Sequence, residues 1–333
     1  MSTLTKAHGS ENQFFILDQT QLDQPLNDGE LSQLAIQICN PAHHVLDGAD
    51  GVLVVNTTTH PDCLGEMRII NADGSEAKMC GNGLRTVTRY LAEKFQQTKF
   101  KIATPFMDLA VEQAPALAPK VPAYSVQIAP ISMAVADLPL HYHDQPVLDN
   151  QLVPEFLPEQ RFTAIAVPNP HLISFVDQID QADLGQLGQG LNATNPYFTE
   201  GVNVSFAVIE GPNQLFVQTY ERGVGFTNAC GTGMSATSLA FARQFADQFD
   251  PAHPITVRNP GGLVQVRVVL GDTAATSQLH LIGNATFTAK LDLPEADLRH
   301  VNLTHLTIRP TDEEAAYQAF VQAANDHAAS SEN

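Results

Sequence analysis

"AKMCGNGLRTVTRYLAEKF", from Ala77 to Phe95, places a cysteine directly before Gly-Asn-Gly and a segment with helical spacing. "TNACGTGMSATSLAFARQF", from Thr227 to Phe245, repeats this arrangement 150 positions later. A single Cys-Gly-x-Gly is ordinarily a tight turn beside an inert thiol. Two copies at matching places instead favour two helix starts that serve one function together.

The two segments predict helices with different surroundings. The first carries its apolar side chains at three- and four-residue steps, which is typical of a helix with one buried face; these are Leu84, Val87, Tyr90, Leu91 and Phe95. The second is apolar almost all round, which is typical of a fully buried helix.

Short segments rich in Val, Ile, Phe and Thr fill most of the chain around these helices. They are bounded by Gly, Pro, Asn or Asp and predict β-strands. Alternation of apolar and polar residues in several of them indicates antiparallel strands with one face in water. Too few helices lie between them for a doubly wound parallel sheet, so the sequence predicts an α+β fold. Examples are "GVLVVN" (51–56), "FKIATP" (100–105), "NVSFAVIE" (203–210) and "LVQVRVVLG" (263–271).

"PALAPKVPAYSV", from Pro115, is the best candidate for a linker, because its prolines interrupt regular structure between two strand-like segments. Each side of it holds several strands, then Cys-Gly-x-Gly, then a helix. We therefore predict two similar halves. Residues 1–122 would form an N-terminal half that carries Cys80 and is joined by the C-terminal segment 290–333, and residues 123–289 would form a C-terminal half that carries Cys230. A short helix or a turn is expected from Gln181, and a last helix near Thr311.

Composition and charge narrow the class of protein. The net charge of −19 disfavours nucleic acid and anionic membrane surfaces as partners. The N-terminus has no basic region followed by an apolar core, and no apolar run approaches the length of a membrane span. We therefore expect a cytoplasmic protein whose partners are neither nucleic acid nor membranes. Its four cysteines are then expected to be reduced thiols: Cys39, Cys63, Cys80 and Cys230.

A helix start gives a cysteine a particular chemistry. The first amides of a helix lack internal partners and, with the macrodipole, favour an anion. A thiol there is expected to lose its proton more readily than a free thiol. The adjacent glycines let a ligand approach these amides. If one substrate carboxylate lay across both helix starts, one thiolate could remove the α-proton and the opposite thiol could supply another, which would invert the stereocentre.

These segments resemble the diaminopimelate epimerases, isomerases of lysine and peptidoglycan precursor biosynthesis. The resemblance rests on "NADGSEAKMCGNGLR" (71–85) and "ERGVGFTNACGTG" (221–233), and "HGSENQFFILD" (8–18), "GADG" (48–51), "NPH" (169–171) and "EGVNV" (200–204) follow the family's order. It implies two pseudo-symmetric halves, each a curved, mostly antiparallel sheet wrapped around a central helix, with the substrate in the cleft between them. It also implies conversion of LL-2,6-diaminopimelate to the meso form without a cofactor.

The resemblance assigns roles to residues. Cys80 and Cys230 would form the acid/base pair and exchange roles with reaction direction, while His171 and Glu221 would tune the thiols. An arginine can clamp a distal carboxylate, and asparagines can bind charged groups without adding net charge. The implied substrate contacts are Asn12, Asn71, Gly81, Asn82, Asn169, Asn203, Glu221, Arg222, Gly231 and Thr232.

The chain departs from the family pattern in three places. "GSEN" (9–12) replaces Gly-Leu-Gly-Asn, so Asn12 is kept but the glycine spacing is not. Phe226 stands where the family has an acid. The chain is also longer than most members, with the extra length expected in residues 135–160 and in the C-terminal tail.

Other functions remain open on the residues alone. One alternative is a two-cysteine racemase acting on proline or hydroxyproline. Another is a cysteine hydrolase with Cys230 as nucleophile and His171 as base. A third is a binding protein without catalytic activity. The paired histidines at 43–44 and at 141 and 143 lack a third ligand at metal-site spacing, so no metal is expected. No pattern indicates NAD, flavin or pyridoxal phosphate, and a homodimer is one candidate assembly.

Overall fold

The computed structural model describes residues 2–77 and 79–331, with side chains up to residue 324. The chain divides into two units, Met1–Val126 with Gly283–Asn333 (unit 1) and Gln127–Ile282 (unit 2). Because the C-terminal segment returns to unit 1, unit 2 is an insertion in the chain of unit 1.

Strands dominate both units. The helices are α1 (Asp28–Ile38), α2 (Gly81–Phe95), α3 (Gln181–Asn192), α4 (Gly231–Gln244), α5 (Glu295–His300) and α6 (Glu313–Ser331). The strands are β1 (Ser2–Gly9), β2 (Asn12–Asp18), β3 (Gly51–Asn56), β4 (Cys63–Asn71), β5 (Glu76–Ala77), β6 (Lys99–Ala103), β7 (Asp108–Ala118), β8 (Val121–Ile128), β9 (Gln151–Leu152), β10 (Arg161–Ala166), β11 (Pro170–Phe175), β12 (Asn203–Gly211), β13 (Gln214–Glu221), β14 (Gly225–Phe226), β15 (Ile255–Asn259), β16 (Gly262–Val269), β17 (Gln278–Asn284), β18 (Thr286–Leu293) and β19 (Thr307–Pro310).

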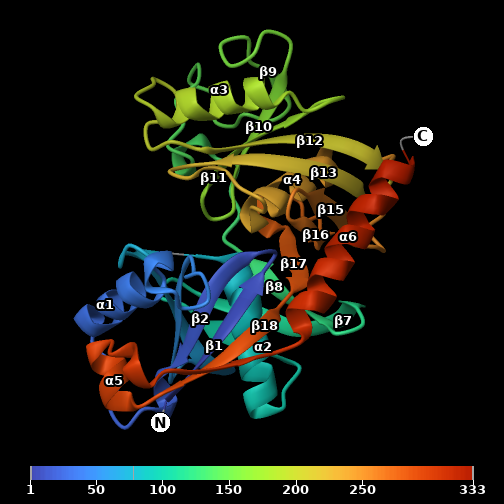
Figure 1. Cartoon of the computed structure of the whole chain (residues 1–333). Coiled ribbons are helices and arrows are strands. Elements are labelled where there is room, and N and C mark those ends of the chain that lie inside the picture. Colours follow the sequence, from blue (N-terminus) through green and yellow to red (C-terminus); the bar gives the residue numbers. More distant parts are fainter. Residues whose placement is uncertain (1, 78, 332–333) are drawn as a thin grey trace. The chain divides into compact units, whose positions relative to one another are not determined.

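The sheet of unit 1 joins segments from both ends of the chain. Strand β1 pairs antiparallel with β2 on one side and with β18 on the other, as the adjacent blue and orange strands in Figure 1 show. From β2 the sheet continues to β3 in parallel and then antiparallel to β4. Strand β4 pairs with β5 and, in parallel, with β6, which leads on to β7 and β8.

Unit 2 repeats this pairing pattern strand for strand. Strand β10 pairs antiparallel with β11, which pairs parallel with β12, and β12 pairs antiparallel with β13. Strand β13 pairs with β14 and, in parallel, with β15, which leads on to β16 and β17. The helices α3 and α4 follow β11 and β14, as α1 and α2 follow β2 and β5 in unit 1. The predicted α+β fold of two halves with the same build is confirmed.

The helices that follow the two cysteines are the buried ones. Helix α2 packs against β1, β2, β3, β4 and β7, and α4 packs against β10 to β13, β15 and β16. Leu84, Val87 and Leu91 of α2 are buried as predicted, whereas Phe95 at its end is 42% exposed. Helix α4 is buried along nearly its whole length, which its apolar sequence predicted.

The predicted linker from Pro115 is wrong. The segment itself forms the end of β7, a tight turn that contains Lys120 with a φ of 63°, and most of β8, and the two strands pair as an antiparallel hairpin. The pairing shifts register between Ala114 and Ala118, and Pro115 lies in this irregular part of the strand. A proline is tolerated at such a bulge, because no ladder hydrogen bond is required there.

Candidate active site

Cys80 lies directly before helix α2 in unit 1. Its Sγ accepts a hydrogen bond from the Gly83 amide at 3.3 Å, so the thiol caps the helix start. The same sulfur donates to Oδ1 of Asn12 at 3.5 Å. A Cβ at position 83 would lie 2.8 Å from Cδ2 of Leu53, which favours glycine there. Unit 1 therefore contains the predicted thiol at a glycine-rich helix start.

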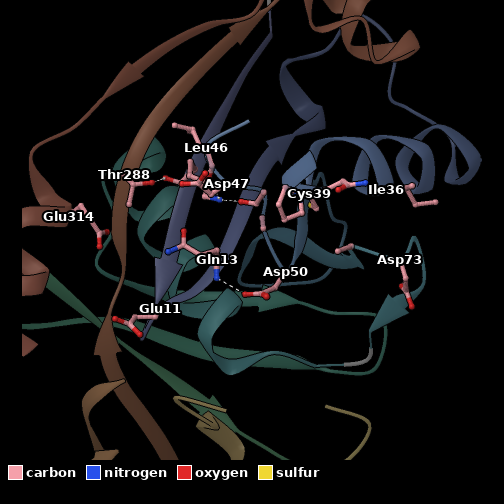
Figure 2. A pocket seen from close by; sticks show the side chains of 16 residues that line it. Glu11, Gln13, Ile36, Cys39, Leu46, Asp47, Asp50, Asp73, Thr288 and Glu314 are labelled. Carbon is pink, nitrogen blue, oxygen red and sulfur yellow. Dashed lines mark hydrogen bonds between the residues drawn. The ribbon is translucent and has the colours of Figure 1, made fainter. Parts of the chain in front are cut away.

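Asn12 connects Cys80 to two further side chains. Nδ2 of Asn82 donates to Oδ1 of Asn12 at 3.4 Å, and Nδ2 of Asn12 donates to the Asp50 carboxylate at 2.5 Å. Asp50 also accepts the Gln13 amide at 2.7 Å (Figure 2), which fixes the orientation of this segment. Oδ1 of Asn82 is buried and has no hydrogen-bond partner among the described residues. This atom is therefore an acceptor that a ligand could satisfy.

Asn71 lies at the end of β4, opposite Gly51 of β3. Its Nδ2 donates to Oγ of Ser75 at 3.0 Å, and its backbone amide donates to the Ser75 carbonyl at 2.8 Å. The side chain thus stabilises its own turn. The role of Asn71 as a substrate contact stays a prediction.

A buried guanidinium lies in the second turn of α2. Arg85 is fully buried; its Nε donates to the Asn284 carbonyl at 3.1 Å and its Nη2 donates to Oγ of Ser10 at 3.1 Å. Burial lowers the pKa of Arg85 to about 10, and Cys80 is among the groups that interact with its charge. A cation near a thiol favours the ionised form. Arg85 belongs to the quoted motif, but nothing in its spacing predicts that its side chain turns inward.

Cys230 occupies the corresponding position before α4 in unit 2. It is buried, and its Sγ lies 3.6 Å from Oγ1 of Thr232. A Cβ on Gly233 would lie 3.2 Å from that sulfur and 3.0 Å from Oγ1 of Thr219, so glycine leaves room for the thiol. The surroundings of the two cysteines therefore differ, with an apolar leucine beneath one helix start and hydroxyl groups beneath the other.

We expected a thiol at a helix start to lose its proton more readily than a free thiol. This expectation is wrong for Cys230. Burial raises the pKa of the Cys230 thiol well above its ordinary value, and the Glu221 carboxylate beside it raises that pKa further. Desolvation and a neighbouring negative charge both oppose formation of a thiolate. Burial and the carboxylate together outweigh the hydrogen bond from the Gly233 amide, which lowers the pKa of the thiol.

Three neighbouring strands of unit 2 carry polar side chains that were assigned to the site. His171 of β11 pairs with Asn203 of β12, and Glu221 ends β13, the next strand of the sheet. The Glu221 carboxylate accepts a hydrogen bond from the Thr227 hydroxyl and also bonds with the Cys230 thiol. Thr227 was not singled out from the sequence, because its contact depends on the turn between β14 and α4.

Asn203 and Arg222 are linked through the backbone. Oδ1 of Asn203 accepts the Arg222 amide at 2.8 Å, and its Nδ2 donates to the Pro170 carbonyl at 3.1 Å. The exposed Arg222 side chain donates from Nη1 to the Glu200 carbonyl at 2.9 Å. This contact holds the guanidinium at the surface of unit 2. Its binding of a distal carboxylate stays a prediction.

His171 is a neutral, fully buried side chain. Its Nε2 lies 3.1 Å from Oδ1 of Asn169, and its Nδ1 has no hydrogen-bond partner in the described part of the chain. Burial lowers the pKa of His171 to about 3, and the Arg222 charge acts in the same direction. Neither ring nitrogen bonds with Cys230, so the described residues do not form the cysteine–histidine pair that a hydrolase would need.

Phe226, which replaces the family's acid, packs away from this polar group. It is 45% exposed, and its ring meets Tyr220 edge-on with centroids 5.4 Å apart. A Cβ on Gly185 of α3 would lie 3.2 Å from the same ring. Phe226 therefore covers the junction between α3 and the hairpin of β13 and β14.

A hollow in unit 1 is lined by Glu11, Gln13, Asp47, Asp50 and Glu314, among others (Figure 2). Of the described residues assigned to the site from the sequence, none lines this hollow. Its walls come from the turn after β1, the loop that precedes β3, and the start of α6. The hollow therefore adjoins the Asn12 segment without containing the thiol.

Two broader properties concern metals and membranes. Among residues 2–77 and 79–331, no three His, Cys, Asp or Glu side chains are grouped so that they could hold a metal ion. His43 bonds with the Gln37 carbonyl at 2.7 Å, and His143 lies 3.2 Å from Glu155. Within the same residues, no helix combines the length and the apolar character that a membrane span needs.

Solved structures with this fold include two proteins of low sequence identity. One is the Bacillus anthracis phenazine biosynthesis protein of the PhzF family, with a TM-score of 0.61 and 13% identity over 88% of this chain and 99% of that one. The other is a probable proline racemase from Agrobacterium radiobacter, with a TM-score of 0.55 and 15% identity over 90% and 96%. At these identities the likeness concerns the fold alone.

Sequence comparison is more specific. The family model for diaminopimelate epimerase matches residues 4–114 and 163–287, and the two segments expected to hold the extra length lie outside these ranges. The diaminopimelate epimerase of Enterococcus faecalis is 48% identical over 322 residues, which are 96% of this chain and 97% of that protein. A match of this extent, together with the shared fold, shows that the chain belongs to the diaminopimelate epimerase family.

Proposed function

We propose that the protein converts LL-2,6-diaminopimelate to meso-diaminopimelate by a two-base mechanism with Cys80 and Cys230. The observation that carries the proposal is the matched position of the two thiols. Each precedes the central helix of a unit, and the two units share one order of strand pairings. A two-base inversion needs one group on each face of the reacting carbon, and a duplicated unit supplies two such groups.

The unequal surroundings of the thiols support this assignment. The buried Arg85 cation interacts with Cys80, whereas Cys230 bonds with the Glu221 carboxylate, which favours its protonated thiol. An inversion starts from one base and one acid. In our proposal Cys80 would act as the base beside the cation and Cys230 as the acid, and the roles would exchange in the reverse direction.

The helix starts would bind the reacting carboxylate. The first amides of α2 and α4 lack intrahelical partners and favour an anion. We assign this role to the backbone at Gly81, Asn82, Gly231 and Thr232. Amides aimed at the carboxylate would also stabilise the negative charge that develops as the α-proton leaves.

The remaining contacts would recognise the rest of the substrate. Asn12, Asn71, Asn169 and Asn203 can bind ammonium or carboxylate groups, and Glu221 can accept an ammonium. Arg222 would bind the distal carboxylate. The second charged end of diaminopimelate favours it over proline, because proline has no group that needs an arginine. The place of the reaction in lysine and peptidoglycan precursor biosynthesis follows from this substrate.

The deciding experiment is a stereochemical assay of LL-diaminopimelate in deuterated water. We expect the wild-type protein to form the meso isomer with deuterium at one α-carbon. Cys80→Ala and Cys230→Ala should each lower this rate by on the order of 10²- to 10⁴-fold, the usual contribution of a general acid or base. Cys63→Ala, at a partly buried thiol outside both helix starts, is the matched control and should retain the wild-type rate.

Other outcomes would assign another function. Inversion of proline without turnover of diaminopimelate would favour the racemase alternative. Loss of activity in only one cysteine variant would contradict a two-base mechanism and would favour a single nucleophile, as in a hydrolase.

A further inference from the structure

The turn between β1 and β2 has a backbone conformation that its residues disfavour. Gly9 pairs with Asn12, so Ser10 and Glu11 form a two-residue hairpin loop. Their φ angles are 52° and 66°, both left-handed. Hairpin loops of this kind prefer Asn-Gly, because a residue with a Cβ is strained in left-handed backbone. Ser-Glu therefore needs support from the surrounding structure.

This turn controls the position of a side chain at the reacting thiol. Asn12 is the next residue after the turn, and its Oδ1 accepts the Cys80 thiol at 3.5 Å. A relaxed turn would move the start of β2 and carry the asparagine with it. The register of Asn12 against Cys80 thus depends on how firmly Ser10 and Glu11 are held.

Helix α6 contacts Ser10 directly and Glu11 through His8. The buried Tyr317 hydroxyl hydrogen-bonds with Ser10. The Glu314 carboxylate lies 2.9 Å from Nε2 of His8, and Nδ1 of that histidine accepts the Glu11 amide at 3.2 Å. His8 is fully buried, and its ring packs edge-on against Tyr317 with centroids 4.7 Å apart. Figure 2 shows Glu11 and Glu314 on the same side of the unit 1 hollow.

The helix is itself anchored in unit 1. Oε1 of Glu313 accepts Nη2 of Arg89 at 2.7 Å, and its other oxygen accepts the Phe287 amide at 2.9 Å. Tyr317 and Val321 form an apolar cluster with Val121 of β8. This anchoring allows α6 to act as a rigid support. The helix lies outside the residues that the family model matches.

From these contacts we infer that α6 positions Asn12 beside Cys80, with Glu314 and Tyr317 holding the Ser10–Glu11 turn in its left-handed conformation. Ser10 is held from the opposite side by Asn284, whose Oδ1 accepts its amide at 2.8 Å, and by Arg85. The C-terminal helix thus compensates for a turn that lacks glycine at its second position. Glu314 and Tyr317 are positioning residues for the proposed reaction.

The test compares two variants of the C-terminal segment. Glu314→Ala with Tyr317→Phe removes both contacts to the turn and leaves the apolar ring in place. Asp312→Ala is the matched control, because Asp312 is exposed and pairs with Lys120 rather than with the turn. We expect the double variant to lose about tenfold in kcat with a smaller change in KM, as misplacement of a catalytic contact would cause. The control should behave as the wild type.

Two further measurements distinguish positioning from a general loss of stability. The rate at which iodoacetamide alkylates Cys80, followed by peptide mass spectrometry, should change at least threefold in the double variant at temperatures where the protein stays folded. Glu11→Gly introduced into the double variant should restore kcat and the alkylation rate, because glycine adopts left-handed backbone without strain.

The inference rests on the proposed function only for the role of Cys80. The alkylation rate needs no substrate, so it tests the positioning of Asn12 even if the reaction is a different one. An unchanged alkylation rate in the double variant would overturn the inference. So would a loss of kcat that Glu11→Gly does not restore at all.

Discussion

His171 is an uncharged side chain that unfolding would expose to protonation. Burial lowers its pKa to about 3, whereas an exposed histidine has a pKa of about 6.5. Below a pH of about 6.5, this histidine binds a proton in the unfolded chain but stays neutral in the folded protein. Stability from this site is therefore present above about pH 6.5 and is lost as the pH falls toward 3, by about 2 kcal/mol between pH 7 and pH 5.

This loss can be measured by urea unfolding of the wild type and of His171→Gln. We expect the free energy of unfolding of the wild type to fall more steeply between pH 7 and pH 5, because glutamine does not titrate. His305→Gln is the matched control, since His305 is exposed and bonded to Asp297. Equal slopes for the wild type and His171→Gln would show that the histidine accepts a proton in the folded state.

At the scale of single residues, the sequence predicted the identity of the thiols but not their acidity. Cys-Gly-x-Gly before a helical pattern is a local signal, and both thiols lie at helix starts as predicted. The charge near each thiol comes from a residue of the same motif, Arg85 for Cys80 and Glu221 for Cys230, and the family resemblance implied only the second. The inward turn of Arg85 and the approach of Glu221 to Cys230 depend on tertiary packing. No spacing in the sequence expresses these contacts.

Helix α3 offers a matched pair of glycines for a test at the scale of elements. A Cβ on Gly188 would lie 2.4 Å from Cγ of Tyr220, whereas a Cβ on Gly190 would meet nothing within 4 Å. Gly190→Ala should therefore stabilise the protein by about 0.5–1 kcal/mol through helix propensity. Gly188→Ala should destabilise it by about 1–3 kcal/mol, because the tyrosine must move.

Thermal or urea unfolding of the two single variants would measure both effects. The substitution is the same and the positions are two residues apart, so differences in helix propensity cancel. A stabilising effect of both substitutions would contradict the close packing of α3 on β13.

Some elements were not predicted because tertiary structure overrides their local pattern. Strand β1 reads as polar, yet Thr5, Lys6 and His8 are buried, since the strand lies between β2 and β18. The charged Lys6 side chain can be buried there because its ammonium group donates hydrogen bonds to the carbonyls of Leu46 and Gly48. Helix α1 begins with a capping box of Asn27 and Glu30, which is a local signal for a helix start in the sequence. The prolines of the segment from Pro115 predicted a linker, but pairing between β7 and β8 overrides this local pattern.

At the scale of the whole molecule, duplication is visible in the pairings more than in the residues. The strand positions that carry His171 and Asn203 in unit 2 carry Phe14 and Gly51 in unit 1. One unit therefore presents two polar side chains where the other has a phenylalanine and a glycine. The cysteine motifs are alike in both units, which is why the sequence indicated two halves from these motifs while the remaining identity was slight.

The division of the chain predicts different behaviour for its parts. Unit 2 is one continuous segment, Gln127–Ile282, whereas unit 1 needs both ends of the chain. A fragment of residues 127–282 should fold alone and unfold cooperatively in urea. A fragment of residues 1–126 should not, because β1 loses its partner β18 and the buried Arg85 loses the Asn284 carbonyl. A buried cation without its acceptor is strongly destabilising.

Complementation separates a missing partner from a generally unstable fragment. Addition of residues 283–333 to the 1–126 fragment should restore the circular dichroism of a folded sheet, since it returns β18 and Asn284. Glu313→Ala in the added segment should weaken this association, because Glu313 pairs with Arg89 of α2. Stable folding of 1–126 by itself would contradict the dependence of unit 1 on its C-terminal segment. It would also imply that α6 is dispensable for the turn before Asn12.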